Sequence, residues 1–376
     1  MGGTNKIALH FMRDLSQYCN VTLILSEGIG ELLSELPKEV HLIIDQTEDF
    51  RNLLKADIKS FKIAYLIRDC LYYAKVKMGK DDIDNYKYII DRYNYISDEV
   101  YDCAISYHGQ SPNLLLNLLY RIKAKKKCVW IHGEMNFQSD ETKKMIKYYE
   151  NIDHFFFVSN PTRAAFYRAV HFDLHKSTVY YNPIDKNEVL KKAATKQSTG
   201  FNSEYINILT VGRLSKEKGQ DMIPCIMKSL LDQKLPVRWY LIGDGDDRER
   251  IEQLIKHYQL DDSVFVLGTQ INPYTYMAEC DIYVQPSYTE GYSTTICEAG
   301  ILGKAIIGTK PSGGIYDQIT DGKDGLIVGA NVSDLAGGIK FLIENKVIRH
   351  MFETNIRNKD FEGEGEINKF LRVLEN

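Results

Sequence analysis

The sequence has few of the features that mark membrane-spanning, secreted or nucleic-acid-binding proteins. No apolar run approaches the roughly 20 residues that cross a bilayer, and no apolar signal segment opens the chain. Positive charge is not in excess, because the formal net charge is −4, and this argues against a nucleic-acid partner. The seven cysteines lie far apart, with no Cys-x-x-Cys spacing. These absences predict a cytoplasmic protein that would meet a membrane only from outside the hydrocarbon.

Strand-sized apolar runs alternate with longer amphipathic stretches along the chain. This alternation predicts an α/β protein with parallel sheets covered by helices. A chain of 376 residues with 44% hydrophobic residues can form two separate cores, so we expect two doubly wound, Rossmann-like domains. The runs are 21–25, 40–44, 103–107, 128–132 and 154–159, then 206–211, 238–243, 264–268, 282–285, 305–308 and 325–328.

A turn signal at 181–185 separates the two series of runs, and the polar stretch 191–203 follows it. We therefore place the first domain at 1–183, the second at 184–350, and a terminal helix that returns to the first domain at 351–376. Ligands of open α/β sheets bind beyond the carboxyl ends of the strands. Two such domains facing each other predict a ligand site in an interdomain cleft.

Two carboxylates, Glu290 and Glu298, flank a predicted loop-to-helix junction. A strand-like run precedes them, Gly291 breaks regular structure, and hydroxyls at 293–295 can cap the next helix. The unpaired N–H groups of such a junction suit a diphosphate, and carboxylates suit the hydroxyls of a sugar. An alternative for Glu298 is a capping box with Thr295, in which the carboxylate only stabilises the helix start.

Cations follow the strand predicted at 206–211. Arg213, Lys216 and Lys218 lie in a loop bounded by Gly212 and Gly219. Arginine can hold phosphate oxygens with two hydrogen bonds, and lysine adds a point charge. A solvated basic turn that caps the next helix is the alternative interpretation.

The order and spacing of the motifs in the second half resemble family 4 of the retaining glycosyltransferases, which have the GT-B fold. Glu290-Gly-Tyr-Ser-Thr-Thr-Ile-Cys-Glu298 is similar in particular to enzymes of bacterial surface polysaccharide assembly. The other motifs are Val211-Gly-Arg-Leu-Ser-Lys-Glu-Lys-Gly219, Leu241-Ile-Gly-Asp-Gly245, Gly268, Asp281-Ile-Tyr-Val-Gln-Pro-Ser287 and Gly313-Gly-Ile315.

The resemblance implies a role for each matching residue. Arg213 and Lys218 resemble the pair that binds the donor diphosphate and stabilises its departure. Glu290 resembles the glutamate that contacts the transferred sugar, and Glu298 the one that holds the nucleotide ribose. His132, at the carboxyl end of a predicted strand, resembles a histidine that positions the donor sugar and the acceptor hydroxyl; taken by itself, such a histidine is more often a hydrogen-bonded structural residue. The further donor contacts implied are Gly2, Gly3, Gly243, Gly268, Gly291, Tyr292, Ser293 and Thr294.

The amino terminus departs from the family pattern. The family begins with a strand that leads into a Gly-Gly loop and a helix, whereas this chain starts at Met1-Gly2-Gly3 with no strand ahead. We expect the first strand of the fold to be missing, through truncation, a misassigned start or a natural variant. Ser293 also replaces a glycine that many relatives have.

Three further segments carry weaker signals. Asp244-Gly-Asp246 and Asp82-Ile-Asp84 resemble metal-binding pairs, but the cationic loop makes an ion unnecessary, so we expect no metal. The stretch from Leu114 to Lys127 predicts an apolar helix followed by cations, which either packs on the sheet or meets an anionic membrane. The Tyr-rich segment 72–95 could line an acceptor groove or cover the sheet.

The resemblance implies a retaining glycosyltransferase that moves a sugar from a nucleotide-diphosphate donor, UDP-linked by preference, to a glycan or lipid-linked acceptor. The reaction of this family is described as attack on the front face, with the leaving phosphate taking the acceptor proton. An inactive relative that acts as an assembly partner is one alternative. Another nucleotide-sugar enzyme of the same fold, an epimerase or a phosphorylase, is a second.

Overall fold

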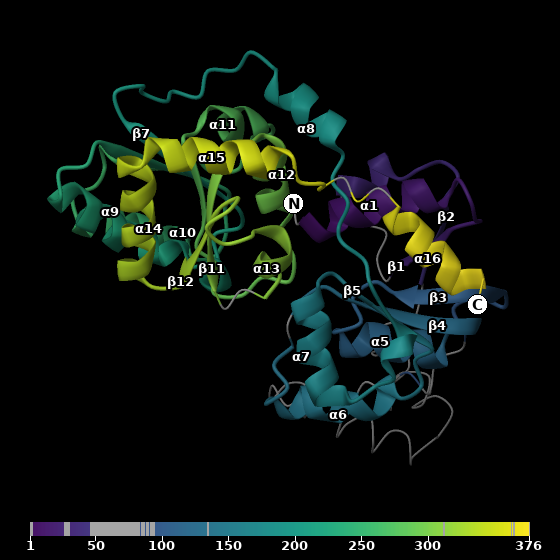
Figure 1. The fold of residues 1–376 in the computed structure, drawn as a ribbon. Helices are drawn as coiled ribbons and strands as arrows, with labels where there is room; N and C mark the ends of the chain where they lie inside the picture. The colour runs from purple at the N-terminus through teal and green to yellow at the C-terminus, as the bar shows by residue number, and fades with distance from the viewer. Residues whose placement is uncertain are drawn as a thin grey trace, which may run out of the picture.

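The computed structural model describes residues 3–25, 31–45, 83, 87, 90, 95–133, 135–310, 313–361, 363 and 365–375. These residues form two α/β halves that lie side by side (Figure 1). Gly2, the pair Asp82 and Asp84, and most of the segment 72–95 lie outside the described residues.

The first half contains parallel strands in two sheets. One sheet pairs β1 with β2, and the other has the order β3-β4-β5-β6. Arg121 ties them together, because its guanidinium donates to both oxygens of Asp45 at 2.6 and 3.0 Å. The strands are β1 Thr22–Leu25, β2 His41–Ile44, β3 Val100–Ser106, β4 Lys123–Ile131, β5 His154–Phe157 and β6 Ser177–Val179. The helices are α1 Gly3–Leu15, η1 Glu31–Glu35, α5 Pro112–Tyr120, α6 Asp140–Tyr149, α7 Asn160–Val170 and η2 Leu174–Lys176.

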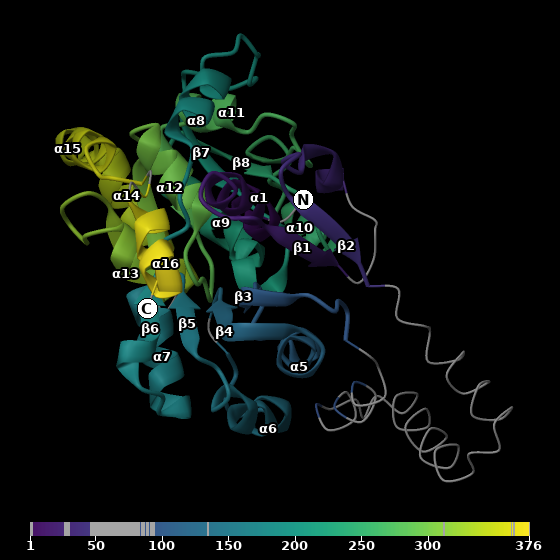
Figure 2. The same ribbon diagram turned by 90° about the vertical axis from the view of Figure 1, so that its right-hand side faces the viewer.

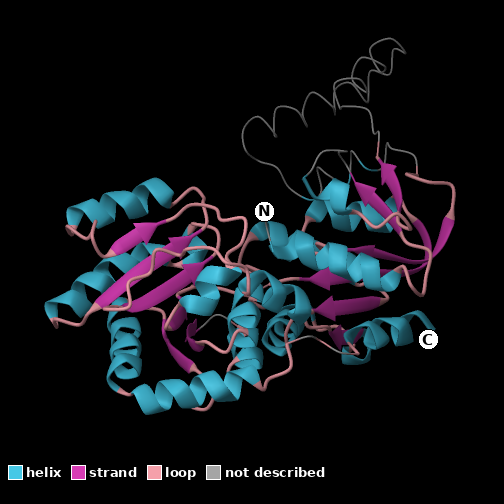
Figure 3. Cartoon of the chain, turned by 90° about the horizontal axis from the view of Figure 1, so that it is seen from above, coloured by secondary structure: helices cyan, strands magenta, loops and turns pink. Residues whose placement is uncertain are grey.

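The second half is a single parallel sheet with the strand order β12-β11-β10-β7-β8-β9. Helices cover both of its faces (Figure 3). The strands are β7 Ile206–Val211, β8 Val237–Ile242, β9 Val264–Val266, β10 Ile282–Gln285, β11 Ala305–Lys310 and β12 Leu326–Gly329. The helices are α8 Lys186–Ala193, η3 Lys216–Lys218, η4 Gln220–Met222, α9 Ile223–Asp232, α10 Arg248–His257, α11 Tyr274–Glu279, α12 Thr294–Ile301, α13 Ile315–Gln318, α14 Val332–Glu344 and α15 Lys346–Arg357. The last helix, α16 Glu366–Glu375, packs on the first half.

This strand order places a topological switch between β7 and β10. The chain runs outward from β7 through β8 to β9, and then returns to the other side of β7 with β10. Ile208 and Leu209 of β7 pair in register with Ile282 and Tyr283 of β10. At such a switch point, the loops that follow the two strands run in opposite directions, and this leaves room for a ligand at the carboxyl ends of the strands. The loops that carry Arg213 and Glu290 are these two loops.

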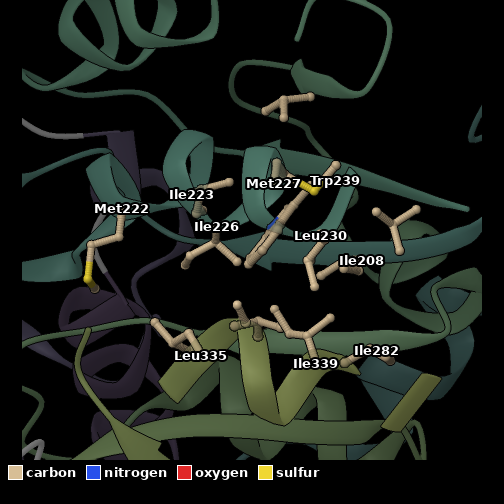
Figure 4. Packing of buried hydrophobic residues seen from close by; sticks show 14 of the residues in the cluster. Ile208, Met222, Ile223, Ile226, Met227, Leu230, Trp239, Ile282, Leu335 and Ile339 are labelled. Atoms are coloured by element: carbon tan, nitrogen blue, oxygen red, sulfur yellow. The ribbon is translucent and has the colours of Figure 1, made fainter. Parts of the chain in front are cut away.

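A dense apolar core holds the switch point rigid. Trp239 of β8 is fully buried among side chains of α9 and α14, including Met227 and Ile339 (Figure 4). Its indole N–H donates to Thr210 Oγ1 at 3.1 Å, and Thr210 donates in turn to the carbonyl of Val284. This chain of bonds joins three adjacent strands, so the two ligand-side loops leave from a fixed base.

The first and last helices both pack at the junction of the halves. Ile7 of α1 packs into the core of the second half, while Phe11 of the same helix contacts Trp130 of β4. Phe370 of α16 packs against Phe11 and Phe156, with ring centroids 5.0 and 5.2 Å apart. The last helix, α16, therefore lies beside α1, on the β3-β4-β5-β6 sheet (Figures 1 and 2).

The cations that follow the Leu114 helix lie in a strand, which corrects the prediction of a basic helix end. α5 ends at Tyr120, and Lys123 to Lys127 form the first half of β4. Lys123 pairs with Asp98, and Lys125 pairs with Asp102. Cross-strand charge pairing with the neighbouring β3 segment explains how a lysine-rich run forms a strand. None of the helices in the described part of the chain has the length and apolar character that a membrane crossing requires.

Candidate donor-binding site

An ion pair lies at the centre of the switch point. Lys218, in the loop after β7, donates to Glu290 Oε2 at 2.5 Å, and Ser287 Oγ donates to the same oxygen at 3.3 Å. The two charged side chains are 21% and 14% exposed, so a ligand can reach them from the open side. A cation and a hydrogen-bond acceptor thus stand side by side, which is the arrangement needed to hold a phosphate next to a hydroxyl.

Buried polar groups fix the position of this ion pair. Gln285 donates to Ser287 Oγ and accepts from Tyr283 and Thr295. Thr309 donates to the carbonyl of Ser287 at 2.5 Å. Because these groups are shielded from water, each bond strongly restricts the loop.

Arg213 lies at the mouth of the same loop. Its side chain is 70% exposed and donates to Glu217 Oε1 at 2.8 Å. Gln220 is 1% exposed and donates to the Arg213 carbonyl at 2.9 Å, which holds the backbone under the guanidinium. An incoming anion could replace Glu217 as the partner of Arg213 without moving the backbone.

Glycines allow the loops after β7 and β8 to touch. Gly243 has φ 138°, and a Cβ there would stand 1.9 Å from the Gly212 carbonyl oxygen. Its N–H donates to the carbonyl of Gly268 at 2.9 Å, so the structure brings both predicted glycines together. Only glycine fits this backbone conformation and spacing.

Glu298 lies in the second turn of α12 and not at the helix start. Ser293 is the N-cap residue, its N–H donates to Gln318 Oε1 at 3.0 Å, and its carbonyl accepts from Gln318 Nε2. The capping-box alternative for Glu298 is therefore wrong, because the helix starts two residues earlier than that spacing requires. Thr294 is instead the first helical residue.

The Glu298 carboxylate accepts from Tyr274 Oη at 2.9 Å. Burial raises its pKa to about 7, while Tyr274 and the charge of Lys6 on α1 oppose the shift. A carboxylate kept poorly solvated in this way is suited to accept hydrogen bonds from ligand hydroxyls. Tyr274 and Lys6 were not predicted from the sequence, and only the contact of α1 and α11 with α12 places them here.

Glu298→Gln is expected to stabilise the protein above neutral pH. The pKa in the folded state lies above the usual 4.5, so folding favours the protonated carboxyl. That contribution is complete below the unfolded-state pKa and is lost as the pH rises through about 7. A neutral glutamine avoids the loss, and we expect a gain of about 1–3 kcal/mol in the free energy of unfolding near pH 8 but none near pH 4.5.

Denaturant unfolding at both pH values measures this difference. Glu204→Gln, at an exposed position before β7, is the control and should change stability little at either pH. An equal gain for Glu298→Gln at both pH values would contradict a raised pKa.

The first half contributes His132, which follows β4. Its backbone N–H donates to Gln110 Oε1 at 3.1 Å, and its imidazole ring stacks on the Trp130 ring, with the two centroids 5.9 Å apart. Burial, together with the nearby His108, lowers the pKa of His132 to about 3. Its Nε2 is shielded and has no partner among the described residues, so a neutral imidazole is available for a hydrogen bond.

His108 follows β3 and was missed at the sequence level. Its ring centroid lies 5.3 Å from that of His132, and burial lowers its pKa as well. The signal that identified His132, a histidine at the carboxyl end of a strand, applied equally to His108.

The two halves touch at Gly291. A Cβ on this glycine would lie 2.0 Å from the His132 carbonyl oxygen and 2.8 Å from Gly133 Cα. The Tyr292 ring packs against Tyr181 with centroids 5.3 Å apart, and Asp317 accepts from the N–H of Asn160 at 2.7 Å. These contacts bring His132 next to the Glu290 loop.

Among the predicted residues, Gly3 begins α1, while Gly2 is not described.

Asp244, in one of the two Asp-x-Asp pairs that resemble metal-binding motifs, has other partners. Asp244 accepts from Arg248 at 2.9 Å and from the N–H of Gly245 at 2.8 Å. In the described ranges, no three His, Cys, Asp or Glu side chains gather closely enough to hold a metal ion.

Comparison with solved structures identifies the fold as GT-B. HepE of Anabaena, solved in complex with UDP, has a TM-score of 0.73 at 17% identity, over 100% of this chain and 96% of that one. Sucrose-phosphate synthase of Thermosynechococcus elongatus also gives 0.73, at 18% identity, over 100% and 93%. The predicted pair of Rossmann-like domains in a GT-B arrangement is thereby confirmed.

Comparison of sequences shows what the second half is similar to. Residues 191–359 match the family model of glycosyl transferases group 1. An N-acetylgalactosaminyltransferase of Campylobacter jejuni, named for the acceptor N-acetylgalactosamine-N,N'-diacetylbacillosaminyl-diphospho-undecaprenol, is 26% identical over 49% of each chain. The O-antigen biosynthesis glycosyltransferase WclY of Escherichia coli is 27% identical over 35% of this chain and 37% of its own. The chain spans about half the length, or less, of these curated relatives.

Proposed function

We propose that this protein is a retaining glycosyltransferase that transfers a sugar from a UDP-sugar to a glycan or lipid-linked acceptor in bacterial surface polysaccharide synthesis. The observation that carries the proposal is the ion pair of Lys218 and Glu290 at the switch point, with Gly291 seated on His132. The names of the relatives support the acceptor class, since one acts on a diphospho-undecaprenol glycan and another in O-antigen synthesis. The UDP complex of HepE supports the donor class.

The geometry suggests how the residues divide the work. A donor diphosphate would draw Lys218 and Arg213 away from Glu290 and Glu217, which balances the charge of the departing phosphate. Glu290, released from Lys218, would accept hydrogen bonds from the sugar hydroxyls, and Glu298 would accept those of the ribose. These two cations supply the positive charge, so the proposal includes no metal ion.

His132 is a positioning residue in this proposal. Its low pKa keeps the imidazole neutral near pH 7, so it orients an acceptor or sugar hydroxyl without adding charge. The bond between the anomeric carbon and the phosphate oxygen breaks as the bond to the acceptor oxygen forms on the same face. The acceptor proton passes to the departing phosphate oxygen.

Cytoplasmic location and peripheral contact with the membrane are parts of the same proposal, because a lipid-linked acceptor lies at the membrane surface. The segment from Leu114 to Lys127 offers little charge for this contact, since Lys123 and Lys125 are paired with carboxylates. Lys126 points instead toward α16.

Calorimetry with UDP and GDP tests the proposal. We expect Arg213→Ala and Glu298→Ala each to weaken UDP binding by at least about tenfold, because each removes a charged hydrogen-bond partner. Arg168→Ala, on the exposed side of α7, is the matched control and should leave the affinity unchanged. Undiminished binding in both site variants would reject the site.

Turnover of UDP-sugars with and without acceptor extracts then separates the related activities. Transfer that requires the extract supports a glycosyltransferase. Epimerised donor without an acceptor would indicate an epimerase, release of sugar phosphate a phosphorylase, and UDP binding without turnover an inactive relative.

A further inference from the structure

The structure contains a second basic site, far from the switch point. A cavity of about 490 Å³ opens between β4, β5, the segment around β6, and α16. Figure 2 shows α16 beside β6, near the carboxyl terminus. The cavity is in the size range of small-molecule pockets, roughly 300–1,000 Å³.

Cations dominate the lining of this cavity. Lys126 comes from β4, Lys176 from η2, and Lys369 and Arg372 from one face of α16, while Asp153 supplies the single lining carboxylate. Four cationic side chains therefore meet one carboxylate, in a chain whose net charge is −4. Such a concentration of positive charge attracts an anion of several negative charges.

Most of the carboxylates nearby are already engaged. Asp153 accepts from the backbone N–H of Lys127 at 2.8 Å, and Glu366 accepts from Lys369 at 2.5 Å. Lys126 donates to the carbonyl of Val373 at 2.5 Å, and within the described ranges neither it nor Lys176 has a carboxylate partner. Lys126 and Lys176 thus bring positive charge to the cavity that no carboxylate of the described residues pairs with.

Neutral donors complete the lining. His154 Nε2 and Thr178 Oγ1 lie 2.9 Å apart at one wall, and His175 lies at the rim. Burial and the charge of Lys126 lower the pKa of His154 to about 4, so its imidazole is neutral near pH 7. Hydroxyl and imidazole groups next to cations are common partners of phosphate oxygens.

The position of the cavity excludes the donor site as its explanation. Lys126 precedes His132 by six residues along β4, about 20 Å at the usual rise of a strand. The cavity therefore lies away from the carboxyl ends of the strands, where the cleft residues gather. The cavity exists only because α16 returns to the β3-β4-β5-β6 sheet of the first half.

We propose that this cavity is a second anion-binding site, which takes a phosphate-bearing ligand through Lys126, Lys176, Lys369 and Arg372. The shared chemistry is a phosphate or diphosphate group, and it could belong to a free anion or to an anionic lipid headgroup. The inference does not depend on catalysis at the switch point.

Titration with inorganic pyrophosphate tests the site. We expect the double variant Lys176→Gln, Arg372→Gln to bind at least about tenfold more weakly than the control Lys125→Gln, since it removes two of the four cations that line the cavity. Lys125 is 72% exposed and pairs with Asp102, outside the cavity. Both variants keep the cleft between the halves, so pyrophosphate that binds there contributes equally to both titrations. The difference in affinity between the two variants therefore measures binding at the cavity.

Vesicles distinguish the two sources of the anion. Binding to phosphatidylcholine vesicles that also contain phosphatidylglycerol, lost in the double variant, would support a lipid headgroup, and pyrophosphate binding without vesicle binding would support a free anion. Lys176→Gln alone, at an exposed position, covers the case in which the double variant folds poorly. Equal pyrophosphate affinity in the cavity variants and the control would overturn the proposal. UDP binding, measured separately, reports only the cleft.

Discussion

Gly291→Ala is expected to reduce sugar transfer by at least about a hundredfold, because it forces the two halves apart at the site. The added Cβ would stand 2.0 Å from the His132 carbonyl oxygen and 2.8 Å from Gly133 Cα. Both neighbours are backbone atoms, so no side-chain rotation relieves the clash. The loop must move, which shifts Glu290 relative to His132. We also expect a loss of stability of about 1–3 kcal/mol, as for other overpacked positions.

Gly337→Ala is the matched control for this substitution. Gly337 lies in α14, and a Cβ there meets nothing within 4 Å. Alanine in an exposed helix should stabilise the protein by about 0.4–1 kcal/mol and leave transfer unchanged. Initial rates and thermal unfolding measure both effects. If Gly291→Ala kept full activity and stability, the contact with His132 would not exist in the working protein.

Lys218→Gln is expected to lower the turnover number by about a hundredfold to a thousandfold. Lys218 is the cation nearest to Glu290, and the substitution removes its charge while keeping much of its length. Glu290 is then left without its partner in a poorly exposed position, so we also expect thermal stability to fall. The expected signature is a large loss of turnover with a smaller change in UDP affinity, because the charge acts most strongly as the phosphate departs.

Lys228→Gln serves as the control, since Lys228 also pairs with a carboxylate, Asp232, but on the exposed surface of α9. We expect it to change neither turnover nor stability by a measurable amount. Steady-state kinetics with a UDP-sugar, beside UDP calorimetry, separates the two parameters. Equal turnover in the Lys218 variant and the control would remove Lys218 from the proposed chemistry.

Several parts of the candidate site could be predicted from the sequence because they depend on local patterns. The apolar run at 206–211 predicts β7, and the run at 282–285 predicts β10, since fully buried parallel strands are continuously hydrophobic. Glycine and charge after each run place Arg213 and Glu290 in loops at strand ends. The doubly wound class follows from the alternation of runs, and comparison with solved structures confirms it.

Other features could not be predicted because they depend on contacts between distant segments. The sequence pattern predicts that the lysines after Ile122 end a helix, whereas in the structure they lie in β4, where Lys123 pairs with Asp98 and Lys125 with Asp102. Thr295 and Glu298 have the spacing of a capping box, yet the buried Gln318 holds Ser293 as the N-cap. In both cases a long-range partner decided between two locally acceptable structures.

Local sequence patterns predict most of the strands, the loops that follow them and the chemical character of the residues in those loops, but they miss β6 and the first half of β4. Contacts between distant segments bring Lys218 to Glu290, place Tyr274 and Lys6 beside Glu298, and seat Gly291 on the His132 backbone. Such contacts also place α16 on the β3-β4-β5-β6 sheet, where it forms one wall of the basic cavity. The physical reason is that periodicity and turn residues act over a few positions. Ion pairs, pKa shifts and close backbone contacts depend on distances between segments that the sequence places far apart.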